Sequence, residues 1–283
     1  MNPKAIYLSI VLICVAPSAI SRTRDRPIDP SIPVQGRWEW NFSNDREFNL
    51  HNLDFCDYYM VFTRQANSVL PPGVTNIYRR SRRAFRTEPL PEFHVHKGAF
   101  PVNFNPDFLY ILPMKAGDST QIRITNNPNE DCNHAFGLVF RVWGYDTVYA
   151  VRGGVVSKNH NQGWRCSPRN LEDGRTLLIY HADRTFAFYG GFSETFVNAG
   201  ERIKAGQPVG LVENRGLMMA FFFLDENKFE NGRPVRHPHT YFRPLFHTTA
   251  GKTRLELNTT YISLWSDEVF TQEMSNRNKR RQE

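Results

Sequence analysis

The 283-residue sequence has only one long hydrophobic run, and that run lies at its N-terminus. Elsewhere no stretch approaches the roughly 18 apolar residues that a membrane-spanning helix needs. The sequence also lacks extended helical periodicity, a Cys-x-x-Cys pair and any signature of a nucleic-acid-binding module. These absences argue against an integral membrane protein, a helical bundle, a cysteine-rich zinc finger and a nucleic-acid-binding protein.

Aromatic residues and turn-forming residues are abundant instead. The chain holds 22 Phe and 11 Tyr together with 18 Pro and 18 Gly, a composition typical of short strands joined by turns. We therefore expect an all-β protein. The formal net charge of +7 gathers in "RRSRR" at 79–83 and "RNKRR" at 277–281, which we interpret as solvated loop and tail charge.

The N-terminal run has the pattern of a cleavable export signal. Lys4 precedes the apolar stretch "AIYLSIVLICVAP", and the small residues of "APSAIS" follow. We assign residues 1–21 to a signal peptide, so that the mature chain begins near Arg22 and is periplasmic or associated with the outer surface. A lipid anchor on Cys14 is the alternative, although "VLI" before it lacks the small residue that lipidation favours.

An exported chain enters an oxidising compartment in which cysteines can pair. Cys56, Cys132 and Cys166 remain after the signal, and their odd number leaves one unpaired. Cys132 and Cys166 are the better pair because both lie in the second predicted domain. Cys56 is then a buried apolar residue or a free thiol.

Changes in composition and the positions of Pro- and Gly-rich segments divide the mature chain into four parts. Their predicted bounds are a Pro- and charge-rich linker at 22–35, a small N-terminal β-domain at 36–105, a larger β-domain at 106–246, and C-terminal strands with a basic tail at 247–283. In the larger domain, "RTLLIYH" and "RTFAFYGGF" around "AD" predict a hairpin over 175–192. "LMMAFFFLD" at 217–225 predicts a buried central strand.

Residues 108–225 resemble the lysostaphin-like (LytM-type) zinc endopeptidases, which cleave peptide cross-links of bacterial cell walls. The most specific piece is "VNAGERIKAGQPVG", which is similar to the family's turn-and-strand signature throughout, and "GLVFRVWGYDTVYAVRGGVV" keeps the family's spacing. The resemblance implies a twisted antiparallel β-sheet or sandwich. The C-terminal extension is similar to that of exported, degenerate members from bacteria of the Bacteroidota type.

The resemblance also shows that the family's catalytic residues are missing. Its zinc ligands are a His and an Asp of the first segment and the second His of the last, and a further His acts as acid and base. Alignment on Gly137 places Ala135 and Val139 at the first two positions. In the third segment the family's Tyr is kept as Tyr189, and Gly191 stands at the acid–base position. The stretch 211–224 contains no His, Asp or Cys. We therefore predict no metal, no cofactor and no peptidase activity.

A non-catalytic member can still bind through the former substrate groove. The family geometry places four residues along this groove, with two more on loops at its rim: Tyr189, Gly191, Met219 and Phe221, and Tyr145 and Arg215. An apolar floor with an aromatic and basic rim suits an extended peptide. We expect the partner to be peptidoglycan or an envelope protein such as a wall hydrolase. The alternative for the apolar residues is that they are simply core.

Two other function classes remain open. One is a divergent zinc endopeptidase of peptidoglycan that uses His134, one residue out of register, with the "HPH" pair at 237–239. The other is a structural envelope protein with a closed groove. We expect the imidazoles of "HVH" at 94–96 and "HPH" to be exposed or locally hydrogen-bonded, and His181 to face solvent or to cap a turn.

Overall fold

The computed structural model confirms the all-β prediction. It describes residues 28–29, 31–40, 46–63, 66–80, 92–126, 136–142, 144–157, 176–213, 216–230, 233–234 and 238–272. Within these ranges the only helical elements are α1 (Asp267–Thr271) and the 3-10 turn η3 (Glu226–Lys228). No helix in these ranges is long and apolar enough to cross a membrane. The predicted signal peptide, the Cys132–Cys166 pair and the tail after Met274 lie outside the described residues.

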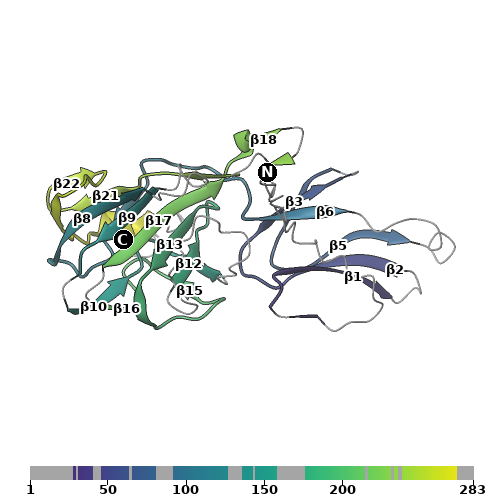
Figure 1. Ribbon diagram of the computed structural model, residues 1–283, viewed down its shortest axis with the longest axis horizontal. Helices are drawn as coiled ribbons and strands as arrows, with labels where there is room; N and C mark the ends of the chain where they lie inside the picture. Colours follow the sequence, from purple (N-terminus) through teal and green to yellow (C-terminus); the bar gives the residue numbers. More distant parts are fainter. Residues whose placement is uncertain are drawn as a thin grey trace, which may run out of the picture.

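The N-terminal part contains two small antiparallel sheets, seen together at the right of Figure 1. One has the order β1 (Val34–Trp40), β2 (Arg46–Asn52), β5 (Gly73–Arg80), and the other the order β4 (Ser68–Leu70), β3 (Tyr58–Phe62), β6 (Phe93–Lys97). Strand β1 thus begins inside the segment that we expected to be linker. Apolar side chains of these strands are buried, among them Phe48, Leu50, Met60 and Leu70.

A nine-stranded sheet forms the centre of the second part. Its order is β15 (Arg202–Ile203), β11 (Gly154–Ser157), β12 (Thr176–Tyr180), β13 (Phe186–Gly190), β17 (Leu217–Leu224), β9 (Phe136–Phe140), β8 (Ser119–Asn126) and β23 (Thr260–Ile262), with β20 (His239–Tyr241) also paired to β17. All these pairings are antiparallel. The predicted hairpin over 175–192 is confirmed by β12 and β13, and the predicted central strand by β17.

Smaller sheets complete this part. They contain β10 (Tyr145–Tyr149), β16 (Pro208–Glu213) and β14 (Phe192–Thr195); β22 (Gly251–Thr253), β21 (Leu245–Thr248) and β7 (Leu109–Ile111); and the pair β18 (Phe229–Glu230) and β19 (Arg233–Pro234). The sheet of β10, β16 and β14 contributes Val148, Val209, Val212 and Phe192 to a core shared with the central sheet.

The central sheet has a different core on each face, because successive side chains of a strand point to opposite sides. On one face Leu138, Tyr189 and Met219 join the core that contains the β10–β16–β14 sheet. On the other face Phe188 and Phe222 join a core with the N-terminal strands. The N-terminal part and the central sheet therefore bury one apolar core between them, and the boundary at 105 stays a prediction.

Candidate functional site

Strand register identifies which side chains share a face with Val139, the residue at the family's Asp position. Val139 lies opposite Met218 of β17, and Met218 lies opposite Gly190 of β13. Ala220 follows two residues after Met218 and therefore points to the same side. Thioether, methyl and isopropyl groups offer no oxygen, imidazole or thiolate ligand for zinc. This half-buried row has no charge with which to bind a metal ion.

Three of the expected groove residues point to the other face. Tyr189, Met219 and Phe221 each have 0% exposure and belong to the core beneath the β10–β16–β14 sheet. The prediction that these residues lie on adjacent strands is confirmed at Tyr189 and Met219, which are paired across β13 and β17. The sequence did not indicate which face of the sheet forms the groove. The structure therefore corrects the expectation that they line an open channel: the three side chains are core residues.

The other three expected groove residues have separate positions. Tyr145 on β10 is 73% exposed and lies opposite Glu213. Gly191 is half-buried, directly after β13, and has a φ of +98°. Arg215 lies outside the described residues. Of the six residues, only Tyr145 offers a large, accessible side chain within the described ranges.

Of the two roles expected for His181, the solvent-facing one is wrong, because its ring is buried. Its Nδ1 donates to the carbonyl of Gly153 at 2.7 Å, and no partner reaches its buried Nε2. Burial, followed by the nearby Arg152, lowers the pKa of His181 to about 3. The imidazole is therefore neutral near pH 7 and fixed in one tautomer by its backbone contact.

An ion pair lies beside His181. Arg152 Nη1 donates to Asp183 Oδ2 at 2.8 Å and to the Tyr110 hydroxyl at 3.1 Å, and its guanidinium stacks on the Phe108 ring at 3.7 Å. Burial by itself would raise the pKa of Asp183, but the Arg152 guanidinium brings it below its ordinary value. These contacts satisfy the charges and hold the turn between β12 and β13 against the segment between β10 and β11.

The histidines of "HVH" and "HPH" approach one another at the edge of the N-terminal part. His94 is exposed on β6, whereas His96 is half-buried with its ring edge-on to Phe229. Burial, and then His239 and His94, lower the pKa of His96 to about 4. His239 Nε2 donates to the Lys97 carbonyl at 3.0 Å. His134 and His237 lie outside the described residues.

No cluster of three or more His, Cys, Asp or Glu side chains suited to a metal ion occurs in the part of the chain that the structure describes.

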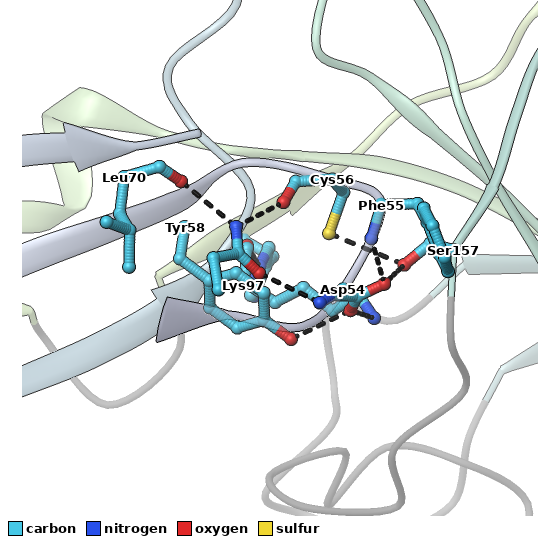
Figure 2. A network of polar contacts seen from close by, with 9 residues as sticks. Asp54, Phe55, Cys56, Tyr58, Leu70, Lys97 and Ser157 are labelled. Atoms are coloured by element: carbon cyan, nitrogen blue, oxygen red, sulfur yellow. Dashed lines mark hydrogen bonds and ion pairs between the residues drawn. The ribbon is translucent and has the colours of Figure 1, made fainter. Parts of the chain in front are cut away.

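A buried polar cluster around Asp54 has no counterpart in the sequence analysis. Figure 2 shows Asp54 between Lys97, Tyr58 and Ser157. Asp54 Oδ2 accepts from Lys97 Nζ at 2.8 Å and from the Tyr58 hydroxyl at 3.0 Å, while Oδ1 accepts from Ser157 Oγ at 2.9 Å. Lys97 and Ser157 lie 43 and 103 positions from Asp54, so no local pattern could have revealed the cluster.

Cys56 belongs to the same cluster and is a buried free thiol, as one of the two alternatives predicted. Ser157 Oγ lies 3.4 Å from its sulfur. Burial, in spite of the opposing effect of Lys97, raises the pKa of Cys56 to about 12. The thiol therefore stays protonated at neutral pH and is a poor nucleophile in the folded protein.

Comparisons with known proteins give one family match and several weak structural similarities. Residues 133–231 match the model of peptidase family M23. A search of curated proteins found no match. Among solved structures, the M23 metalloprotease pseudoalterin from the deep sea is 14% identical with a TM-score of 0.33, covering 58% of this chain and 98% of its own.

Two further solved structures are similar at the same low level. A putative glycyl-glycine endopeptidase LytM from Ruminococcus gnavus is 13% identical, with a TM-score of 0.29 and coverage of 46% of this chain and 55% of its own. A chain of the SpoIIIAH and SpoIIQ complex is 17% identical, with a TM-score of 0.25 and coverage of 49% and 95%. Within this β-rich chain, the segment 133–231 is therefore similar to peptidase family M23.

Proposed function

We propose that the chain is a non-catalytic M23-type protein of the cell envelope that binds cell-wall peptide or a partner protein such as a wall hydrolase. The observation that carries the proposal is the apolar row of Val139, Met218 and Ala220 on one face of the central sheet. A metallopeptidase needs three protein ligands and an open water position, and an acid–base group near them. These side chains supply neither.

The backbone at Gly191 supports the same proposal. Its φ of +98° is a conformation that side chains rarely adopt, and a Cβ placed there would lie 2.9 Å from the Gly216 carbonyl oxygen. An imidazole at this position would be strained in the present fold. This backbone conformation therefore supports the proposed loss of the acid–base histidine at position 191.

Zinc content and hydrolysis test the loss of catalysis together. Chelator-washed protein, incubated with equimolar zinc and desalted, should retain far less than one zinc per chain and release no peptide from isolated peptidoglycan sacculi. One tightly held zinc with sacculus cleavage would contradict the proposal.

The alternative is a divergent zinc endopeptidase of peptidoglycan with relocated ligands, namely His134 and the "HPH" pair; of these, His239 lies near His96, which could contribute a further imidazole. If zinc is retained, replacing His96 and His239 with Gln should abolish retention under this alternative. The variant His94→Gln, on the exposed side of β6, is the matched control.

The binding proposal centres on Tyr145, since an exposed aromatic side chain is a common anchor of an interface. We expect Tyr145→Ala to weaken co-sedimentation with sacculi, or capture of a purified wall hydrolase, by about tenfold while the protein stays folded. Val102→Ala removes another exposed apolar side chain and should leave binding unchanged. Full binding by Tyr145→Ala would show that Tyr145 is not part of the binding surface.

The proposed location is outside the cytoplasm, and it rests on the signal-like N-terminus. N-terminal sequencing of the mature protein from a periplasmic or surface fraction should begin near Arg22. An intact Met1 on cytoplasmic protein would contradict it.

A further inference from the structure

Strand β5 is an outer strand of the β1–β2–β5 sheet in the N-terminal part (Figure 1). It pairs with β2 from Gly73, opposite Asn52, to Arg80, opposite Arg46, with one register shift after Phe48. Alternate residues of an antiparallel strand direct their N–H and C=O groups away from the paired neighbour. In the described part of the chain no second strand pairs with β5, so these outward groups form an open edge.

The edge of β5 is longer than the other sheet edges in the described ranges. β5 has eight residues, whereas β1 has seven, β6 and β10 have five each, and the remaining edge strands have four or fewer. Two of the shorter edges are also covered: Tyr149 N of β10 donates to the Pro113 carbonyl at 3.0 Å, and Ile111 N of β7 donates to the Val151 carbonyl at 3.2 Å. Proteins keep edge strands short or covered because an open edge pairs readily with another chain.

Most of β5 carries no charge that would prevent such pairing. Residues 73–78 are uncharged, and Val74 is 62% exposed. Ile77 packs against the core of the N-terminal strands, and the Asn76 side-chain amide donates to Asn49 Oδ1 of β2 at 2.9 Å. These contacts hold β5 in its sheet without using its outer edge. A chain laid along this edge would therefore meet free backbone groups and an apolar side chain.

Positive charge gathers at the far end of the strand. β5 ends with Arg79 and Arg80, and Arg80 lies opposite Arg46 in the register. Glu47, opposite Arg79, is the one carboxylate in these two residue pairs. The guanidinium group keeps its charge at every pH relevant here and forms strong hydrogen bonds with carboxylates. This end of the sheet therefore favours an acidic partner.

Charge also argues against an occupant from the chain itself. The segment "RTRDRP" at 22–27 and the tail "EMSNRNKRRQE" at 273–283 both contain more basic than acidic residues. A second copy carries the same net charge of +7, and this charge opposes self-association. An acidic segment of another protein has the complementary charge.

We propose that the outer edge of β5 binds an extended acidic segment of a partner protein by strand addition. The backbone N–H and C=O groups of residues 73–78 pair with the segment, and Arg79 and Arg80 attract its carboxylates. Tyr145, on which the proposed envelope binding centres, lies on β10 in another sheet. The edge of β5 is therefore a separate surface, and the inference does not depend on the proposed function.

Hydrogen exchange of the full-length mature protein tests the pairing directly. The probe is a synthetic peptide of consecutive glutamates followed by alternating Thr and Val, so that an antiparallel peptide places its glutamates beside Arg79 and Arg80. The β5 amides that do not bond to β2 should exchange rapidly in the free protein. At a probe concentration of about ten times its Kd they should exchange about tenfold more slowly, whereas the β17 amides should not change.

Peptide affinities, measured by fluorescence anisotropy, separate the backbone contribution from the charge contribution. Proline in place of the Val residues removes N–H donors from the peptide and should abolish binding. Lysine in place of the glutamates should weaken binding to the wild type by about threefold or more. This second comparison needs no protein variant, so it stands even where a variant fails to fold.

A charge reversal places the contact on β5. Arg80→Glu should weaken binding of the glutamate peptide by about threefold or more and strengthen binding of the lysine peptide. Lys204→Glu, on the exposed turn after β15, changes the net charge equally and should leave both affinities unchanged.

Three results would overturn the inference. The first is a glutamate peptide that binds no better than the lysine and proline peptides. The second is protection of all β5 amides in the free protein at every protein concentration, which would show that another segment of the chain covers the edge. The third is protection that disappears on dilution, which would identify a second copy as the occupant. None of these measurements involves zinc or sacculi, so failure here is distinguishable from failure of the proposed function.

Discussion

Tyr189 illustrates how a residue that is kept in the family pattern can be structural. Its ring is fully buried, and its hydroxyl oxygen accepts a hydrogen bond from the Val151 amide at 2.9 Å. Burial raises the pKa of Tyr189 above its ordinary value, so the hydroxyl stays neutral. The hydroxyl therefore satisfies a buried amide on the segment between β10 and β11, and it does not reach a ligand on the surface.

Replacement by phenylalanine tests this role directly. Tyr189→Phe leaves the Val151 amide without its acceptor and should lower the free energy of unfolding by about 1–3 kcal/mol in urea titrations. Tyr145→Phe removes a hydroxyl from an exposed ring and should change stability by no more than about 0.5 kcal/mol. Loss of partner binding by Tyr189→Phe at unchanged stability would point to a functional hydroxyl instead.

At the scale of elements, the turn after β6 joins the N-terminal strands to the central sheet. Gly98 N donates to the Asp57 carbonyl at 2.8 Å, and its φ of +95° lets the chain pass close to Phe186. Gly117 has a similar φ of +91°, but nothing lies within 4 Å of the position of its Cβ. Replacing Gly117 therefore measures the cost of the left-handed backbone alone, whereas replacing Gly98 measures that cost together with crowding against Phe186.

The comparison of alanine variants measures the crowding. Gly117→Ala should cost about 1–2 kcal/mol, from the left-handed backbone alone. Gly98→Ala should cost about 1–3 kcal/mol more, because the added methyl group must displace the Phe186 ring in a packed core. Urea denaturation of both variants checks this expectation. An equal decrease in the free energy of unfolding for both variants would mean that the Phe186 ring moves aside without destabilising the protein.

Sequence patterns predicted individual strands better than the face on which each side chain lies. "LMMAFFFLD" predicted the buried strand β17, and the apolar stretches around "AD" predicted the β12–β13 hairpin. The same run is apolar at every position from Leu217 to Leu224, so alternation could not indicate which residues face the groove. Met218 and Ala220 face the N-terminal strands, whereas Met219 and Phe221 face the other core.

Contacts between distant parts of the whole molecule were beyond the reach of the sequence. Asp54 and Ser157 are polar residues with no local pattern, and only the packing of the N-terminal strands on the sheet brings them together. Histidines with lowered pKa values occur in both parts of the molecule. His96 lies in the N-terminal part, and His181 lies in the segment that the M23 family model matches.

Acid should therefore weaken the whole molecule through both histidines. The unfolded chain binds a proton at each near pH 6.5, whereas folded His96 and His181 bind one only near pH 4 and pH 3. Between these values the unfolded state holds more protons, so the free energy of unfolding falls as the pH is lowered from about 6.5. The expected slope is about 1.4 kcal/mol per pH unit for each histidine.

Carboxylates titrate in part of the same range, so the histidine contribution is isolated by differences between variants. His181→Asn keeps a side-chain N–H group for the Gly153 carbonyl, and His96→Gln keeps a side chain of similar length; neither can take up the proton. Urea titrations at pH 7, 6, 5 and 4 should show a shallower loss of stability for each variant than for the wild type, and the shallowest for the double variant. Parallel pH profiles for the wild type and the double variant would mean that water reaches both rings in the folded protein and that their charged forms are tolerated there.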